Sequence, residues 1–392
     1  MKYFKGAEII TEKQVLKDYV LGVGDTFSVL ELEDRFLAQR ERFPAGDGEI
    51  VDAEGLLIAP GLIDVHIHGS GGKDTMEGTT EALTTISGAV AQNGVTAFLA
   101  TTMTMSPEAI FKALESIRSG LGMEMPGAQL LGAHMEGPFI SEQFKGAQDS
   151  KYIQLPSWDM VEPFKDIIKI VTLAPEQPGA KELIGKLKEH GIIASIGHTT
   201  ATYEQAMEGI AAGASHCTHL FNAMTGIHHR NAGNAVAALS SDIYCELIAD
   251  KIHVHPGLFE LIRKAKGTER VTLITDCIEA GGMPDGIYSL GGQPVIVKDG
   301  EARLENGTLA GSVLRLNQGI SNFYQNTKAE LHEVFRMASL NQATELGIDD
   351  RKGSIEVGKD ADFFLMDREF NVKATYVKGK CVYSEAGGSI DN

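Results

Sequence analysis

The sequence predicts an α/β fold: a (β/α)8 TIM-type barrel with a small β-sandwich domain formed from both chain termini. Two observations predict it. Apolar runs that resemble buried strands alternate with helical patterns through the middle of the chain. The two ends instead share short stretches of period-2 alternation with Gly or Asp at the turns. We therefore expect one barrel whose chain enters and leaves through a common β domain.

The terminal segments are the first element of this prediction. Residues 1–58 are predicted to form short strands and turns. Residues 353–392 show the same pattern in GSIEVGKDADFFLMD and VKATYVKGKCVYSEAGG. Chain termini often lie close together, so two halves of one domain can flank an inserted domain. The sequence thus predicts a split β domain from 1–58 plus 353–392, and a catalytic barrel from 59–352.

Eight apolar runs supply the expected barrel strands. Helical patterns such as PEAIFKALESIRSGL and KELIGKLKEHG separate several of them, and eight strand–helix units complete a (β/α)8 barrel. Beyond the last run, three Gly-marked turns predict a hairpin-like insertion that leads to final helices at about 315–347. The predicted strands are 61–68, 95–102, 129–136, 168–174, 192–197, 216–222, 244–249 and 271–276.

Composition limits the class of partner. The 392 residues include 53 acidic and 35 basic side chains, for a net charge of −18, and 43% are hydrophobic. Such a charge argues against nucleic acid or an anionic membrane as the main partner, but a local Arg or His site can still bind a small anion. The chain can bury a large core.

Cysteine usage and the first residues bear on the compartment. The four cysteines (Cys217, Cys245, Cys277 and Cys381) are far apart and form no CxxC pair, so we expect neither a disulfide framework nor a thiolate metal site. No signal peptide is apparent, and no run approaches the ~20 apolar residues of a membrane helix. We expect a cytoplasmic protein.

Five of the apolar runs finish in side chains that can bind or serve a metal. Imidazole and carboxylate are common ligands of first-row divalent metals. In a (β/α)8 barrel the carboxyl ends of the strands form the active site, so these groups would meet there. They are His66 and His68 in IDVHIHG, Glu136 in LLGAHMEGP, His198 in IIASIGHT, His219 in HCTHLFNAM and Asp276 in VTLITD.

Each of these residues also has a simpler interpretation, because a lone buried histidine is more often a core group than a ligand and a loop glutamate is usually solvated. His66 and His68 share one strand face and can chelate one ion. Asp276 closes an apolar strand, where its desolvation must be offset. Because all of these residues occur together at the carboxyl ends of predicted strands, we favour a metal site over these simpler interpretations. His134 we interpret as interior packing, and His216, expected on the opposite face from His219, as structural.

The pattern predicts a metal-dependent hydrolase. Amide hydrolysis at neutral pH requires a better nucleophile than free water and a polarised carbonyl, and a divalent cation provides both. A nearby carboxylate can then carry the proton from the water to the leaving amine. Asp276 suits that role.

The motifs together resemble the N-acetylglucosamine-6-phosphate deacetylase family of the amidohydrolase superfamily. The resemblance runs in order from about residue 50 to 370, and it is much more specific than the HxH pair alone. It rests on GLIDVHIHG, HMEGPF, SIGHTTATYEQA, THLFNAM, IADKIHVHP, LITD, LAGS and GSIEVGKDADFFLMD.

The resemblance implies removal of the acetyl group of N-acetylglucosamine 6-phosphate, in amino-sugar catabolism and cell-wall sugar recycling. It implies one or two divalent ions per subunit, zinc or iron. Glu136, His198 and His219 would hold the principal metal, whereas His66 and His68 match a further metal site that some relatives lack.

The resemblance also implies roles in chemistry and substrate binding. Asp276 would be the general base and acid, and His253 would polarise the acetamido carbonyl. Arg230 would bind the phosphate from the neighbouring subunit of a homodimer, although an ordinary solvated loop cation is the simpler interpretation. The remaining implied contacts to the phosphosugar are Ala147, Gln148, Asn222, Ala223, Leu309, Ala310 and Gly311.

Three departures from the family pattern bear on substrate preference. Gln148 stands where many relatives have His, Lys251 where many have Gly, and Cys277-Ile278-Glu279 replaces small residues. The galacto epimer of the substrate stays open as an alternative. Cyclic amidases such as dihydroorotase usually carry a bridging lysine, where this chain offers Glu136. A non-catalytic scaffold should have lost ligands, yet all expected ones are present.

Overall fold

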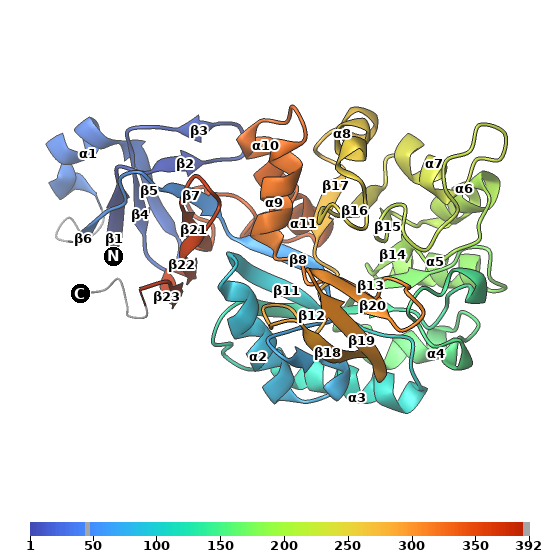
Figure 1. The fold of residues 1–392 in the computed structure, drawn as a ribbon. Coiled ribbons are helices and arrows are strands. Elements are labelled where there is room, and N and C mark those ends of the chain that lie inside the picture. Colours follow the sequence, from blue (N-terminus) through green and yellow to red (C-terminus); the bar gives the residue numbers. More distant parts are fainter. Residues whose placement is uncertain (44–47, 387–392) are drawn as a thin grey trace.

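A parallel barrel forms the centre of the protein, as predicted. The computed structural model describes residues 1–43 and 48–386. Eight strands lie in the order β17-β16-β15-β14-β13-β12-β11-β8, and every neighbouring pair is parallel (Figure 1). They are β8 (Leu62–Ile67), β11 (Val95–Thr102), β12 (Gln129–Glu136), β13 (Ile168–Leu173), β14 (Ile193–Ile196), β15 (His216–Cys217), β16 (Tyr244–Ile248) and β17 (Val271–Ile274).

The barrel closes where its first and last strands meet. Ile67 and Cys277 form a parallel bridge, and the Asp276 amide donates to the His66 carbonyl at 2.9 Å. Buried Asp64 reinforces the join, since its Oδ2 accepts the Thr275 hydroxyl at 2.6 Å. Burial raises the pKa of Asp64 to about 7, against the lowering effect of these hydrogen bonds. The ends of β8 and β17 are therefore fixed beside each other.

One predicted strand is much shorter than expected. The prediction ran from 216 to 222, but β15 comprises only His216 and Cys217. His219, Phe221 and Ala223 have positive φ angles of 29°, 77° and 48°, which extended chain cannot accommodate. The apolar character of HCTHLFNAM therefore reflects burial in a tight turn rather than a longer strand.

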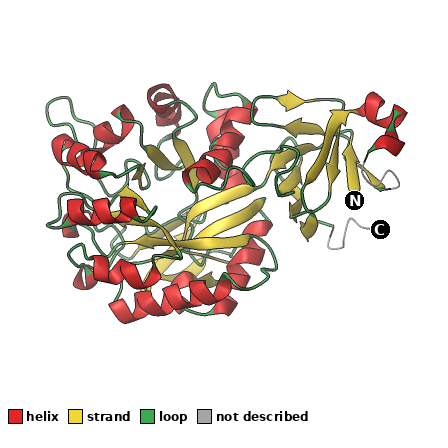
Figure 2. Ribbon diagram, turned by 180° about the vertical axis from the view of Figure 1, so that it is seen from behind, coloured by secondary structure: helices red, strands yellow, loops and turns green. Residues whose placement is uncertain are grey.

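Helices surround the barrel (Figure 2). In α3 (Pro107–Gly120) the Ser106 hydroxyl accepts the Ala109 amide, and Ile110, Ala113 and Ile117 face inward at helical spacing. The others are α2 (Thr80–Ala91), α4 (Trp158–Val161), α5 (Ala180–Glu189), α6 (Tyr203–Ala212), α7 (Asn234–Ser240), α8 (Phe259–Lys266), α9 (Leu316–Gln325), α10 (Leu331–Arg336) and α11 (Leu340–Glu345).

Strands from both chain ends build two mixed sheets beside the barrel (Figure 1). One has the order β5-β4-β1-β6, and the other has the order β23-β22-β21-β7-β2-β3. The second joins the ends, since β7 pairs antiparallel with β21. These strands are β1 (Lys2–Lys5), β2 (Glu8–Ile10), β3 (Val15–Leu16), β4 (Tyr19–Val23), β5 (Phe27–Leu32), β6 (Glu49–Asp52), β7 (Leu57–Pro60), β21 (Phe363–Met366), β22 (Val372–Val377) and β23 (Lys380–Ser384), with α1 (Glu33–Ala38) after β5.

Aromatic packing holds the two sheets together. Phe363 stacks on Tyr376 with ring centroids 4.5 Å apart, and Phe4 meets both rings edge-on. This core contains residues from both ends of the chain, as the split-domain prediction required. The boundaries at 58 and 353 stay a prediction, and 44–47 and 387–392 of that predicted domain lie outside the described residues.

The expected insertion is a three-stranded antiparallel sheet rather than a hairpin. It consists of β18 (Gly286–Leu290), β19 (Gln293–Lys298) and β20 (Glu301–Leu304), in that order. Its inner residues Leu290 and Leu304 line the pocket at the barrel mouth. A two-stranded ribbon of β9 (Gly69–Ser70) and β10 (Lys73–Asp74) follows the first barrel strand. None of the helices in 1–43 and 48–386 is long and apolar enough to cross a membrane.

Candidate active site

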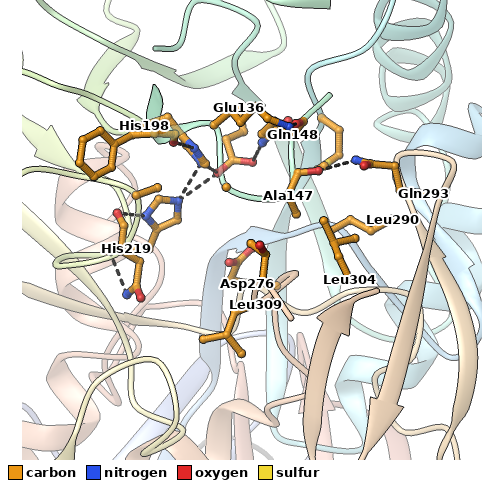
Figure 3. A pocket seen from close by; sticks show the side chains of 18 of the residues that line it. Glu136, Ala147, Gln148, His198, His219, Asp276, Leu290, Gln293, Leu304 and Leu309 are labelled. Atoms are coloured by element: carbon orange, nitrogen blue, oxygen red, sulfur yellow. Dashed lines mark hydrogen bonds and ion pairs between the residues drawn. The ribbon is translucent and has the colours of Figure 1, made fainter. Parts of the chain in front are cut away.

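A pocket of about 680 Å³ lies at the carboxyl ends of the barrel strands, beneath the inserted sheet. Figure 3 shows its central side chains, with Glu136, His198 and His219 grouped opposite Leu290 and Leu304. The amide of Gln293 donates to the Ala147 carbonyl at 2.5 Å, which ties the insertion to the loop after β12. Of the predicted metal and catalytic residues, the lining includes His68, Glu136, His198, His219, His253 and Asp276.

Three predicted ligands converge on one point. Glu136 Oε1 lies 3.1 Å from His198 Nε2 and 3.2 Å from His219 Nε2, and the two ring nitrogens are 3.1 Å apart. Ligands of a tetrahedral zinc ion, with bonds of about 2.0–2.1 Å, would be ~3.3 Å apart. The three atoms therefore stand close to the spacing that one divalent cation requires.

Backbone geometry at the strand ends aims these side chains at the barrel axis. His198, His219 and Asp276 have positive φ angles of 48°, 29° and 51°. Such angles are uncommon outside glycine and often occur at functional sites, where the surrounding structure maintains them. Lys251, with φ of 71°, occupies the same region, which glycine adopts most readily.

The second ring nitrogen of each histidine sets its tautomer. His198 Nδ1 lies 2.9 Å from the Phe144 carbonyl, and His219 Nδ1 lies 3.2 Å from the Asn222 carbonyl. A carbonyl only accepts, so Nδ1 carries the proton in each ring and Nε2 carries a lone pair. Two lone pairs and a carboxylate oxygen then face one another, an arrangement that a cation stabilises.

A second group adjoins the first through Glu136. His66 Nε2 and His68 Nε2 lie 3.4 Å and 3.2 Å from Asp276 Oδ1. His68 Nε2 also lies 3.5 Å from Glu136 Oε2, while His66 Nε2 lies 3.4 Å from Glu136 Oε1. Glu136 Oε1 thus borders both groups, and Glu136 Oε2 faces His68 of the second. The donors present fit one divalent cation and leave room for another.

Electrostatics favour positive charge at this point. Burial works to raise the pKa of Glu136, but His198, His219 and His66 hold it well below its ordinary value. Likewise burial lowers the pKa of His66, but Glu246 and Asp276 outweigh it and raise that pKa well above the usual range. Several buried carboxylates therefore demand compensation by protons or by a cation.

Asp276 and His253 are available for chemistry. Asp276 is buried, yet His66 and His68 keep the pKa of its carboxyl below the ordinary value, so it is a carboxylate near neutral pH. His253 Nδ1 lies 2.6 Å from Asp250 Oδ2, which leaves Nε2 as the ring nitrogen available to the pocket. A carboxylate that can accept a proton and an imidazole nitrogen therefore both border the cavity.

Gln148 contacts the predicted metal ligand directly. Its Nε2 donates to Glu136 Oε2 at 2.5 Å, and its Oε1 accepts the Thr104 amide at 2.7 Å (Figure 3). The Thr104 amide fixes which end of the side chain faces Glu136. Gln148 therefore orients Glu136 as well as bordering the pocket.

Replacing Gln148 by leucine should weaken metal binding. The Gln148→Leu variant removes the donor to Glu136 Oε2, and loss of such a partner costs roughly 10–100-fold in metal affinity. Competition with a coloured chelator would measure the dissociation constant for Zn²⁺. Gln148→His, the residue of many relatives, is the matched control and should retain most of the affinity. Equal affinity in Gln148→Leu and wild type would contradict the orienting role.

Not every predicted substrate contact lies at the pocket. The lining includes Ala147, Gln148, Asn222, Ala223, Leu309 and Gly311. Ala310 is buried beside it, in the core under the inserted sheet. Arg230 is exposed outside the lining of its own chain, where its Nη1 lies 2.7 Å from His229 Nε2. Lys145 and Arg303 are lining cations that the motif reading missed, because nothing in their local sequence marks them.

The two remaining barrel histidines occupy different environments. His134 is packed in the interior, as expected, with Nδ1 2.9 Å from the Val65 carbonyl and Nε2 2.7 Å from Thr172 Oγ1. Burial and His66 lower its pKa to about 3, so its ring is neutral. His216 lies outside the pocket lining and contacts Glu246, which also accepts the His219 amide, and its structural role stays a prediction.

His216 should make the free energy of unfolding decrease as the pH becomes alkaline. Although burial opposes it, Glu345 and Glu246 raise the pKa of His216 to about 10, above the ~6.5 of an unfolded chain. Its contribution to the free energy of unfolding is then complete below pH ~6.5 and is lost as pH rises through about 10. His216→Gln should cost about 3–5 kcal/mol at low pH, as for a broken buried ion pair.

Urea unfolding of wild type and His216→Gln at a series of pH values from 6 to 10 would measure this. The gap between the two free energies of unfolding should narrow steadily over that range. A gap that stays constant would contradict a charged His216.

Glu246 is the principal residue that sequence reading overlooked. It is fully buried in β16, with Oε2 2.9 Å from His66 Nδ1. The signal was present, because a carboxylate within the apolar run YCELIAD needs compensation as much as Asp276 does. It was missed because it lies in the middle of its strand rather than at the carboxyl end.

Comparison with known proteins agrees with this architecture. The amidohydrolase family model matches residues 57–382. The N-acetylglucosamine-6-phosphate deacetylase of Bacillus subtilis (strain 168) is 40% identical over 388 residues, which is 97% of this chain and 96% of the relative. An N-acetylgalactosamine-6-phosphate deacetylase from Escherichia coli O157:H7 is 33% identical over 381 residues, 96% of this chain and 98% of that relative.

Solved structures of deacetylases also match this chain over nearly its whole length. The crystal structure of N-acetylglucosamine-6-phosphate deacetylase from Pasteurella multocida has a TM-score of 0.90 at 34% identity, over 97% of this chain and 99% of that one. A mutant of the Mycobacterium smegmatis enzyme, in complex with N-acetyl-D-glucosamine-6-phosphate, has a TM-score of 0.88 at 28% identity, over 98% and 99%. The chain therefore belongs to the N-acetylglucosamine-6-phosphate deacetylase family of the amidohydrolases.

Proposed function

We propose that the chain hydrolyses the 2-acetamido group of N-acetylglucosamine 6-phosphate to glucosamine 6-phosphate and acetate, in amino-sugar catabolism and cell-wall sugar recycling in the cytoplasm. The observation that carries this is the convergence of Glu136, His198 and His219 beside the carboxylate of Asp276 in one pocket. Relatives with this activity span almost the whole chain.

The principal cation would be held by Glu136 Oε1 and the Nε2 atoms of His198 and His219, and we propose zinc or iron. A second would be held between His66, His68 and Asp276. A divalent cation bound there lowers the pKa of a water molecule and polarises a carbonyl oxygen.

The protein's own residues supply the proton transfers. Asp276 takes a proton from the attacking water and later delivers it to the departing amine, which requires the ionised carboxylate that His66 and His68 maintain. His253, held by Asp250 through Nδ1, donates from Nε2 to the acetamido oxygen in its protonated form. The inserted sheet, with Leu290 and Leu304, covers the pocket and limits access of bulk water.

The phosphate would be bound by Asn222 and Ala223 of one subunit and by Arg230 of its neighbour in a homodimer. The exposed position of Arg230, outside the pocket of its own chain, suits a residue that acts across an interface. A guanidinium fork matches the geometry of phosphate oxygens.

Arg230→Ala should raise KM for the phosphosugar about 10–100-fold with little change in kcat, since a charge-assisted hydrogen bond contributes roughly 1.5–3 kcal/mol. Mixing subunits tests whether the residue acts across the interface. A dimer of one Arg230→Ala chain and one Asp276→Asn chain has one site with both residues intact if Arg230 is donated by the partner. Such a dimer should recover about half of the wild-type activity at low substrate. If the mixed dimer recovered no activity, Arg230 would not act on the active site of the neighbouring subunit, which would contradict the proposal.

The direct test of the reaction is release of acetate from three substrates by the metal-loaded protein. We expect turnover of N-acetylglucosamine 6-phosphate to exceed turnover of N-acetylglucosamine, which lacks the phosphate. The third substrate, N-acetylgalactosamine 6-phosphate, addresses the epimer that the Escherichia coli relative is named for. Faster turnover of the galacto substrate would assign that activity instead, and no acetate from any of them would contradict the proposed reaction.

A further inference from the structure

Four buried side chains form a continuous line from the far end of the barrel to the candidate metal site. Glu345, on α11, lies 2.7 Å from His216 Nδ1. His216 Nε2 lies 3.1 Å from Glu246 Oε1, and Glu246 Oε2 lies 2.9 Å from His66 Nδ1. We call these residues the buried acid–histidine line. His216, Glu246 and His66 are fully inaccessible to solvent.

Glu246 is the member of this line that touches both groups of predicted metal ligands. Its Oε2 accepts from the ring of His66 and also from the backbone amide of His219, at 2.9 Å each. Its Oε1 makes the ionic contact with His216. An ionised carboxylate this deep in the barrel is costly unless its partners compensate it, and each of its oxygens has such a partner.

This geometry decides which nitrogen of His66 can bind a cation. A carboxylate only accepts, so His66 Nδ1 must carry the proton that Glu246 receives. Nε2 is then the nitrogen left to face a cation, which would take the place of a proton there, and it lies 3.4 Å from both Glu136 Oε1 and Asp276 Oδ1. His66 Nε2 has no hydrogen-bond partner among the described residues. A buried ring nitrogen that lies near two carboxylate oxygens and makes no hydrogen bond points to a cation between them.

We propose that Glu246 is the positioning residue of the second cation site: it holds His66 in the Nδ1-protonated tautomer and thereby makes Nε2 a ligand beside His68 and Asp276. His216 and Glu345 compensate the charge of Glu246 from behind. This inference rests on the proposed second cation and concerns the ion count rather than the substrate.

Glu246 is a positioning group rather than a ligand itself. Among the described residues, the one group in which Glu246 could hold an ion also contains His66 and His134. Both nitrogens of His134 are already engaged, by the Val65 carbonyl and the Thr172 hydroxyl. Both oxygens of Glu246 are engaged as well. The atoms of this group that are still available to bind a cation therefore lie on the pocket side of His66.

Three variants separate this role from a general need for buried charge. Each is loaded with Zn²⁺, dialysed, and measured for bound zinc by elemental analysis, with circular dichroism to verify the fold. Wild type should hold two ions per chain. Glu246→Leu should hold one, because the second ion's affinity falls by roughly 10–100-fold while the site of Glu136, His198 and His219 survives. Glu246→Gln should hold two, because its amide oxygen still accepts from His66.

Glu345→Gln is the matched control, since it removes a buried charge from the same line without touching His66, and it should also hold two ions. One ion in wild type, or two in Glu246→Leu, would overturn the proposal. Equal loss of an ion in Glu345→Gln would do the same, because the cause would then be charge and not position.

A second measurement needs no variant that could fail to fold. In zinc-loaded wild type with ¹⁵N-labelled histidine, His66 should show a protonated Nδ1 and a metal-shifted Nε2, and the opposite tautomer would overturn the proposal. Failure of the proposed reaction can be distinguished from failure of this proposal. If the protein bound two ions but released no acetate, the reaction would be contradicted and the role of Glu246 would not.

Discussion

Asp276→Asn should abolish turnover of N-acetylglucosamine 6-phosphate while the protein keeps its fold and the cation at Glu136, His198 and His219. Asparagine has nearly the same shape as aspartate, but it cannot take a proton from water at neutral pH. General acid–base catalysis contributes roughly 10²–10⁴-fold to the rate, so kcat should fall by about that factor or more. Acetate release and bound metal must be measured on the same sample.

Asp242, an exposed aspartate, provides the matched control, because Asp242→Asn removes a carboxylate far from the pocket. It should leave kcat unchanged. Wild-type activity in Asp276→Asn would remove Asp276 from the mechanism. Loss of all bound metal in that variant would instead make it chiefly a ligand.

His198→Ala should lower both bound metal and rate. His198 Nε2 is one of three atoms that converge on the principal site, and its ring is fixed by the Phe144 carbonyl. Loss of a direct ligand should weaken metal binding by more than the roughly 10–100-fold that loss of an outer hydrogen-bond partner costs. Titration of the metal-free protein with Zn²⁺ would give the dissociation constant.

The control for this variant is His190→Ala, which removes an exposed imidazole that stacks on Trp158 outside the pocket. It should bind metal and turn over like wild type. Unchanged zinc stoichiometry and affinity in His198→Ala would show that His198 is not a ligand.

The sequence predicted the barrel well because burial and strand order impose simple rules. Parallel strands covered on both faces read as apolar runs, and the carboxyl end of each run identified Glu136, His198 and Asp276. The position of these residues in one pocket follows from topology alone. The prediction for 216–222 was less accurate, because a buried turn with positive φ angles is as apolar as a strand.

What could not be predicted depends on packing across the barrel. The contact of Glu246 with His66 joins residues 180 positions apart, and that of His216 with Glu345 joins residues 129 apart. No local pattern encodes such distances. Gln148 was predicted as a substrate contact and a departure from relatives, whereas the structure shows its hydrogen bond to Glu136. Arg230 stays a prediction, because its proposed partner is a second subunit.

The central claim is that Asp276 deprotonates the attacking water beside the site where Glu136, His198 and His219 would hold an activating cation. Stripping the protein with a chelator and adding Zn²⁺ back stepwise, with acetate release from N-acetylglucosamine 6-phosphate followed at each step, tests it most directly. We predict no turnover without metal and a rate that rises in proportion to occupied principal sites. Full turnover by metal-free protein, verified by elemental analysis, would contradict it.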